Sequence, residues 1–274
     1  MAWTCLRRAR KYMRNLFGSV GRMFITFLQD LTSIFHLLKE TLVQTALLVK
    51  DRKRRKQARI LASVDEIGSF SILLVLLVSS LLGIGLTVVI AFNLDDLGLL
   101  TAIPGVVVVA VYRFLAPLIT GIIVAGRMGA AFTARIGTMK VTEEVLALEV
   151  MAISPVRFLV VQRFLGMVIA LPALTVLGSF TAVFASLLFC VSRFGMGPNV
   201  YLTGILDVLT PTDVLSGAVK AFVFAVSIVM IGCYRGLIVE GSAEEVGKAT
   251  MVTVVWSTLT IVVLDTVLTT AFYG

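Results

Sequence analysis

Residues 126–163 read GRMGAAFTARIGTMKVTEEVLALEVMAISPVRFLVVQR, a polar and charged stretch that lies between long apolar segments. Thr142 precedes a run of good helix formers and can cap a helix whose first turn carries two glutamates, near the positive end of the helix dipole. Pro155 ends that helix, because the residue before a proline avoids helical angles. The stretch therefore predicts one short helix over residues 143–152, exposed to water between two membrane spans.

Two interpretations of this short helix are open. It is either an ordinary connection between spans or a docking element for a partner protein. In the second case its charged side chains are Glu143, Glu144 and Glu149, and its apolar contact surface consists of Val145, Leu146, Leu148 and Met151.

The composition is that of a membrane protein that crosses the bilayer several times. Hydrophobic residues make up 58% of the 274 residues and charged residues 15%, whereas a soluble domain carries about 25% charged residues. The net charge is +8, and fourteen of the 24 Lys and Arg residues lie before residue 60. This uneven basic excess is typical of a cytoplasmic segment that contacts anionic lipids, and it does not indicate nucleic-acid binding.

The chain offers little material for a metal site, a catalytic triad or a disulfide framework. It has one histidine, His36, and three widely separated cysteines, Cys5, Cys190 and Cys233. Their spacing matches no metal-ligand pattern, and we expect no cofactor.

Residues 1–66 form a basic N-terminal region. Within it, residues 16–48 carry apolar side chains at three- and four-residue steps, which predicts an amphipathic helix. Charged residues interrupt any apolar run of spanning length, so this helix should lie on the membrane surface. The following segment DRKRRKQAR, residues 51–59, should hold the chain at an anionic surface.

Residues 67–274 form a permease domain with five predicted spans, each long enough to cross a bilayer core about 30 Å thick. We place them at about 69–92, 104–126, 166–190, 213–238 and 251–273. The N-terminal region and the loops 127–163 and 239–250 carry nearly all the basic residues outside the spans. By the positive-inside rule the N-terminus is cytoplasmic and the C-terminus faces outward.

Three charged residues lie well inside the predicted spans, away from their ends: Arg113, Lys220 and Asp265. Counting 1.5 Å per residue from the outward ends puts all three about 10–13 Å deep. Isolated charges at such depth are costly, so we expect them to face the protein interior, Asp265 to pair with Lys220 or Arg113, and the cluster to border the transport path.

The segment 241–249, GSAEEVGKA, superficially resembles a phosphate-binding loop. It has five residues between its glycines instead of four, and no Ser or Thr follows Lys248 directly. We therefore predict no nucleotide site and no enzymatic activity in this chain. An intramembrane enzyme is disfavoured as well, because the spans hold no His-Glu motif, paired-aspartate motif or nucleophile elbow.

Residues 125–175, AGRMGAAFTARIGTMKVTEEVLALEVMAISPVRFLVVQRFLGMVIALPALT, resemble the signature region of the MlaE/YrbE permease family, and residues 220–274 also fit. These proteins are membrane subunits of ABC transporters that move phospholipids or other lipids between bacterial membranes. The resemblance implies an all-α polytopic fold in the inner membrane, with an N-terminal interfacial helix, five transmembrane helices and a short cytoplasmic coupling helix.

The resemblance also implies partners. It suggests a separate ATPase that docks on the cytoplasmic loop, a periplasmic lipid-binding protein with an MCE domain, and a homodimer of the permease. The competing hypothesis is an ion-coupled secondary transporter or channel, for which the charges inside the spans would serve ion coupling. An odd number of spans argues mildly against that build, because inverted repeats are common among secondary transporters.

Overall fold

The computed structural model describes residues 28–46, 54–95 and 99–274, and every regular element within these ranges is a helix. Five helices are long and apolar enough to cross a membrane. They cover Ser71–Leu94, Leu100–Val141, Val156–Phe194, Pro211–Leu237 and Ala243–Tyr273. The predicted all-α class with five candidate spans is confirmed.

The elements follow one another in a simple order. Residues 28–46 form one helix. The others are α2 (Arg54–Asp95), η1 (Leu100–Ala102), α3 (Ile103–Ala110), η2 (Val111–Leu115), α4 (Ala116–Val124), η3 (Ala125–Gly129), α5 (Ala130–Val141), α6 (Glu144–Val150), η4 (Val156–Val160), α7 (Val161–Phe194), α8 (Pro198–Leu206), α9 (Pro211–Leu237) and α10 (Ala243–Tyr273).

Three of the five candidate spans extend well beyond the ranges expected from hydropathy, namely Leu100–Val141, Val156–Phe194 and Ala243–Tyr273. α5 and η4 occupy much of the stretch 126–163 that the sequence placed in a loop. The connection between the second and third candidate spans therefore consists of residues 142–155 only. The physical reason is that apolar composition marks only the part of a helix embedded in hydrocarbon, while the backbone hydrogen bonds continue past it.

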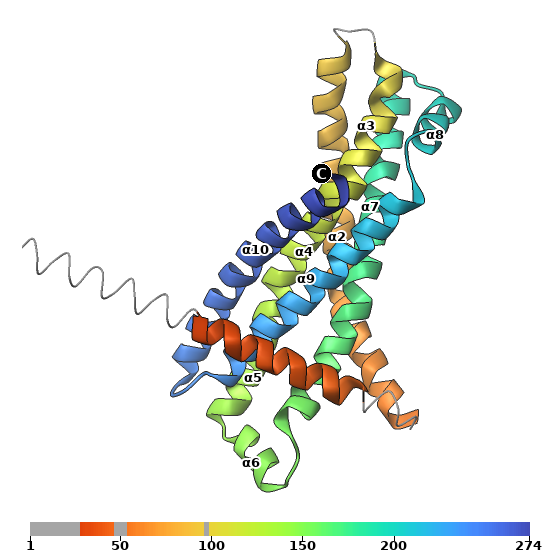
Figure 1. Cartoon of the computed structure of the whole chain (residues 1–274). Helices are drawn as coiled ribbons and strands as arrows, with labels where there is room; N and C mark the ends of the chain where they lie inside the picture. Colours follow the sequence, from red (N-terminus) through yellow and green to blue (C-terminus); the bar gives the residue numbers. More distant parts are fainter. Residues whose placement is uncertain (1–27, 47–53, 96–98) are drawn as a thin grey trace, which may run out of the picture.

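α6 is shorter than the predicted helix over 143–152, and Thr142 does not cap it. Thr142 instead closes α5, where its hydroxyl donates to the Thr138 carbonyl at 3.1 Å. The residue before α6 is Glu143, whose left-handed backbone (φ 61°) makes a tight turn between the two helices. In Figure 1, α6 lies at the lower end of the bundle, and α3 and α8 lie at the opposite end.

α2 and α7 pack closely against each other because Gly83 of α2 has no side chain at their contact. A Cβ atom on Gly83 would lie 2.1 Å from the Ala182 carbonyl oxygen, which is far inside van der Waals contact. Near this contact Thr87 and Ser186 share a hydrogen bond of 2.6 Å, and Ser186 accepts another of 2.7 Å from Tyr201 of α8. Tyr201 is fully buried, and burial raises the pKa of its phenol to about 12, so it is a neutral donor.

The helix over residues 28–46 runs across the spanning helices near the end of the bundle that carries α6 (Figure 1). Asp30 attaches it to α9, accepting hydrogen bonds from the Tyr234 hydroxyl at 2.7 Å and from Arg235 at 3.0 Å. Leu37 is buried against the bundle, whereas Phe35 on the other side is 62% exposed. The remaining parts of the predicted amphipathic helix, residues 16–27 and 47–48, and the side chains of the basic segment 51–59 lie outside what the structure describes.

Candidate functional site

A polar cluster joins the second, fourth and fifth candidate spans in the interior of the bundle. Lys220 of α9 is completely buried, and its Nζ donates three hydrogen bonds. The acceptors are Asp265 Oδ1 at 3.1 Å, Thr269 Oγ1 at 2.7 Å and the backbone carbonyl of Arg113 at 2.6 Å. Asp265 is thus paired with Lys220, and both side chains are buried within the bundle.

Proline explains why a backbone carbonyl is available to Lys220. Pro117 has no N–H, so the carbonyl of Arg113, four residues earlier, has no α-helical donor. The helix forms the π-helical turn η2 here, with Ala116 N–H bonded to the Val111 carbonyl. α9 can approach this turn because Gly217 has no side chain: a Cβ there would already lie 3.2 Å from the Tyr112 carbonyl oxygen. The ammonium of Lys220 donates a hydrogen bond to this carbonyl.

Arg113 itself pairs with Asp213, an acid that our sequence reasoning did not assign to the cluster. Arg113 Nε lies 2.7 Å from Asp213 Oδ1, and its Nη2 lies 3.4 Å from Oδ2. The guanidinium also covers the ring of Tyr273 at 4.4 Å, and the Tyr273 hydroxyl donates to Asp213 at 3.1 Å. The signal that could have revealed this acid is the sequence Thr210-Pro-Thr-Asp213 before an apolar run, a capping-box pattern that fixes the acid at the start of α9.

The cluster therefore contains two cations and two carboxylates that neutralise one another. Three of the four side chains are buried, and only Arg113 is partly exposed, at 33%. One atom stands apart: Asp265 Oδ2 is buried and accepts no hydrogen bond within the described part of the chain. The arrangement connects three helices, and the described residues include no group of three potential metal ligands.

The short helix α6 presents an apolar surface to its surroundings. Val150 is 81% exposed and Met151 60%, and Leu146 is exposed too. Glu143, Glu144 and Glu149 are exposed beside them, and Leu148 is half-buried. Val145 does not belong to this surface, contrary to expectation, because it is buried against the bundle. Val150 is the exposed residue that the sequence argument missed.

The segment 241–249 folds as a helix start. Ser242 precedes α10, and the Lys248 amine lies 3.0 Å from Glu244 and 2.8 Å from Glu245 of the same helix. The lysine charge is thus directed at carboxylates of its own helix.

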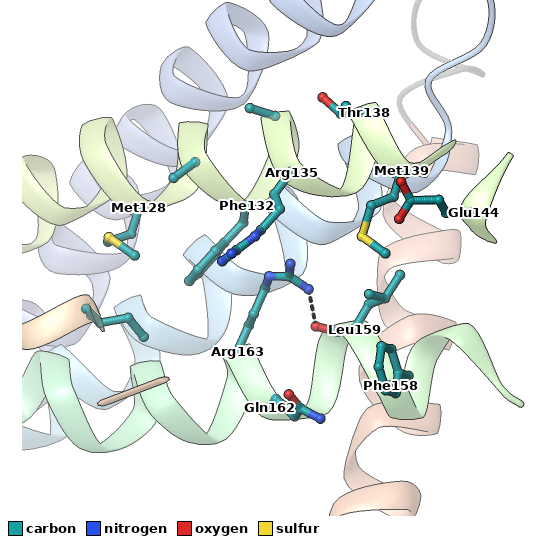
Figure 2. A pocket seen from close by; sticks show the side chains of 13 residues that line it. Met128, Phe132, Arg135, Thr138, Met139, Glu144, Phe158, Leu159, Gln162 and Arg163 are labelled. Carbon is teal, nitrogen blue, oxygen red and sulfur yellow. Dashed lines mark hydrogen bonds between the residues drawn. The ribbon is translucent and has the colours of Figure 1, made fainter. Parts of the chain in front are cut away.

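A cavity of about 820 Å³ opens between α5 and the start of α7, near α6. Figure 2 shows Arg135 and Arg163 reaching into it from opposite walls, so that their guanidinium groups point toward one another. Arg163 donates to the Leu159 carbonyl and lies over the Phe132 ring at 5.8 Å. Both arginines belong to the charged stretch 126–163, and nothing in the sequence analysis brought them together.

Comparison with known proteins gives a consistent result. The family model "Permease MlaE" matches residues 60–271. A probable ABC transporter permease protein of Synechocystis is 35% identical over 201 residues, which are 73% of this chain and 76% of that protein. A chloroplastic protein of Arabidopsis thaliana named TRIGALACTOSYLDIACYLGLYCEROL 1 is 34% identical over 78% of this chain and 61% of its own length.

A relative from Haemophilus influenzae is matched over almost its whole length. It is named intermembrane phospholipid transport system permease protein MlaE, and it is 29% identical over 95% of this chain and 98% of its own length. The family match covers most of the sequence, and it agrees with the five candidate spans and with the signature stretch beside α6. The chain therefore belongs to the MlaE permease family of ABC transporter proteins.

Proposed function

We propose that this chain is the membrane permease subunit of an ABC transporter that moves phospholipid or a related lipid between the inner membrane and the periplasm or outer membrane. The observation that carries the proposal is α6. α6 is exposed, and it carries apolar side chains flanked by glutamates. On a chain of a permease family, such a helix can serve as the docking element for a separate ATPase subunit. Glu143, Glu144, Leu148, Glu149 and Met151 are the proposed coupling residues.

The lipid substrate is supported by the relative from Haemophilus influenzae, whose name specifies phospholipid transport between membranes. By the same resemblance we propose a homodimer in the inner membrane and a periplasmic partner with a lipid-binding MCE domain. The distribution of Lys and Arg supports a cytoplasmic N-terminus, a cytoplasmic α6 and an outward-facing C-terminus.

The cluster of Arg113, Lys220 and Asp265 is proposed to border the lipid path and to hold three spans in register while the transporter changes conformation. Its charges balance internally once Asp213 is included. Such a cluster keeps a polar interior stable without an ion from outside.

A second candidate function is ion-coupled transport, and one observation favours it. Asp265 Oδ2 is buried without a hydrogen-bond partner among the described residues, and a carboxylate oxygen of this kind can accept a proton. The pairing of Asp265 with Lys220 opposes this candidate, because the ammonium stabilises the ionised carboxylate.

Affinity purification of the full chain from its native membrane distinguishes the two candidates. The proposed function predicts an ATPase subunit that co-purifies in stable stoichiometry and is lost when Glu144 and Glu149 are both changed to Lys. A preparation that transports lipid and contains no ATPase would overturn the proposal and leave the ion-coupled transporter in its place.

A further inference from the structure

The connection between α7 and α9 folds back along the bundle instead of extending away from it. α7 ends at Phe194, and Gly195 follows in the left-handed conformation (φ 62°), which a residue without a side chain adopts freely. In Figure 1, α8 lies beside α3, and the upper ends of α2 and α3 rise above it in the view. The level of α8 along the spans is set by its contacts with them.

One chain of hydrogen bonds joins α8 to the membrane-embedded part of two spans. The Tyr201 hydroxyl donates to Ser186 Oγ of α7 at 2.7 Å, and Ser186 shares a hydrogen bond of 2.6 Å with Thr87 of α2. Ser186 lies four residues before the end of the span predicted at 166–190, and Thr87 lies five residues before the end of the span predicted at 69–92. At 1.5 Å per residue, both hydroxyl groups belong to positions about 6–8 Å inside the hydrophobic boundary.

The end of α8 and the turn after it lie against the start of α3. A Cβ atom on Gly204 would lie 3.4 Å from the Cβ atom of Pro104, and a Cβ atom on Gly105 would lie 3.1 Å from the Val208 side chain. Pro104 is the first residue of the second predicted span, and α3 has the wholly apolar sequence IPGVVVVA. These close approaches put the end of α8 at the level where an apolar span begins.

The chain then descends further into the bundle. Asp213, the third residue of α9, pairs with Arg113 at 2.7 Å, and Arg113 lies nine residues beyond Pro104. Nine residues correspond to about 13 Å along a helix. α9 therefore begins inside the membrane region, and residues 198–212 lead from the edge of that region to this depth.

The surface that α8 turns away from the bundle is apolar. Residues 195–212 contain a single charged residue, Asp207. Leu206 is 76% exposed, and the other exposed large hydrophobic side chains of this segment are Val200, Leu202 and Val208. The helices beside α8 also expose apolar side chains near these contacts, namely Val106 of α3 and Phe184 and Leu188 of α7. The surface of α8 thus continues the apolar surface of the spans, which acyl chains surround in a bilayer.

The backbone between α8 and α9 is paired as hydrocarbon requires. A segment in lipid has no water to satisfy its polar groups, so its N–H groups need partners within the protein. The N–H groups of residues 207–210 all have such partners. Carbonyls of Thr203 and Ile205 accept the first three at 2.8–3.2 Å, and the Asp213 carboxylate accepts the fourth at 3.0 Å. α8 and α9 also each begin with a proline, which carries no N–H.

We propose that residues 198–212 form a re-entrant segment in the bilayer leaflet at the end of the bundle opposite α6, with the exposed side of α8 against the acyl chains of that leaflet. The partner of this surface is the surrounding bilayer, not a transported lipid and not a second protein. The level of the contacts, the apolar surface and the paired backbone all favour hydrocarbon over water. The proposal rests on the membrane-spanning fold and does not depend on the proposed function.

The test measures which environment surrounds α8 when the purified full chain is reconstituted into phosphatidylcholine vesicles. In a background where Cys5, Cys190 and Cys233 are changed to Ala, Leu202→Cys or Leu206→Cys carries a nitroxide spin label. Electron paramagnetic resonance compares the collisions of the label with oxygen, which concentrates in hydrocarbon, and with a nickel chelate, which stays in water. Both labels replace exposed side chains, and an unchanged helical circular dichroism shows that the fold is kept.

Two matched controls come from α7. Leu188→Cys labels an exposed position within the span predicted at 166–190, and Ser192→Cys labels an exposed position one helical turn later, beyond that span. We expect the oxygen-to-nickel collision ratio of both α8 labels to equal that of Leu188→Cys. It should exceed the ratio of Ser192→Cys about tenfold, which corresponds to about 1.4 kcal/mol.

Two other results would overturn the proposal. A collision ratio equal to that of Ser192→Cys would show that α8 faces water, and would leave its apolar surface to a partner protein. Few collisions with either reagent would show that a second copy of the chain covers the surface. The vesicles contain no ATPase and the measurement involves no transport, so the proposed function is tested separately.

Discussion

Among the described residues, Asp265 is the only carboxylate that contacts Lys220, so changing Asp265 to Asn removes that carboxylate and leaves the lysine charge in place. Lys220 is completely buried, and its Nζ keeps only the Arg113 carbonyl and the Thr269 hydroxyl as acceptors. Breaking one side of a buried ion pair costs about 3–5 kcal/mol. We expect a value near 3 kcal/mol, because two neutral acceptors remain.

The double variant Asp265→Asn with Lys220→Met removes both charges, and its cost comes from a different source. The Arg113 carbonyl, which Pro117 deprives of its α-helical donor, then loses the hydrogen bond from the ammonium. A buried unsatisfied carbonyl costs about 1–3 kcal/mol. Lys220→Met alone should cost about as much as Asp265→Asn, because it leaves a buried carboxylate unpaired. The double variant is therefore expected to be more stable than the sum of the two single changes predicts, by about 3 kcal/mol.

Thermal unfolding of the full chain in detergent, followed by the loss of helical circular dichroism, measures this cycle. With about 2–4 °C per kcal/mol for a chain of this size, Asp265→Asn should lower Tm by about 6–12 °C and the double variant by less than the summed losses. The control is Asp207→Asn, which changes an exposed aspartate after α8 and should leave Tm unaltered. Additive losses, or a single variant as stable as the wild type, would refute the reasoning that the pair neutralises itself in the interior.

Three further predictions follow from other parts of the structure. The double variant Glu144→Lys with Glu149→Lys reverses two charges of α6 and should weaken binding of the ATPase subunit in a pull-down. The helical circular dichroism should stay unchanged, because both side chains are exposed. If the variant retained the partner fully, α6 would not be the docking element. Gly83→Ala should destabilise the packing of α2 on α7, because the new Cβ would overlap the Ala182 carbonyl. We expect such overpacking to cost about 1–3 kcal/mol. An unaltered Tm would contradict the close approach of the two helices. The purified chain without partners should hydrolyse no ATP in a phosphate-release assay, and hydrolysis that disappears in Lys248→Ala would show that the segment before α10 is a nucleotide site after all.

Much of the fold could be predicted because membrane spans leave a strong signal in the sequence. The five apolar runs are long and contain few charged residues, so their number predicts the number of spans. Counting along each helix at a fixed rise per residue predicts one common level for Lys220 and Asp265, and in the structure the two side chains are in contact.

Features that depend on helix ends or on packing were less accessible. Thr142 has the residue type of an N-cap, but α5 continues far enough to use its hydroxyl, so α6 begins after it. Asp213 is the first residue of the predicted span 213–238 and was not counted among the charges inside the spans, although its carboxylate reaches Arg113 from there. α8, in the connection before that span, was not predicted at all, since its nine residues carry too short a pattern.

The cavity could not be predicted, because it depends on how two helices meet. Arg135 and Arg163 are 28 positions apart in the sequence, and nothing in their spacing indicates that their side chains converge. Only the turn at Glu143 and the return of the chain through η4 bring them to one space.

The most direct test of the central claim is ATP-driven lipid movement. The permease and the ATPase that co-purifies with it would be reconstituted into proteoliposomes that contain a labelled phospholipid, together with the lipid-binding partner as acceptor. The account predicts transfer of the label that requires ATP, requires the ATPase subunit and is insensitive to collapse of ion gradients. Transfer that proceeds without ATP and stops when a proton or sodium gradient is dissipated would contradict it and identify an ion-coupled transporter.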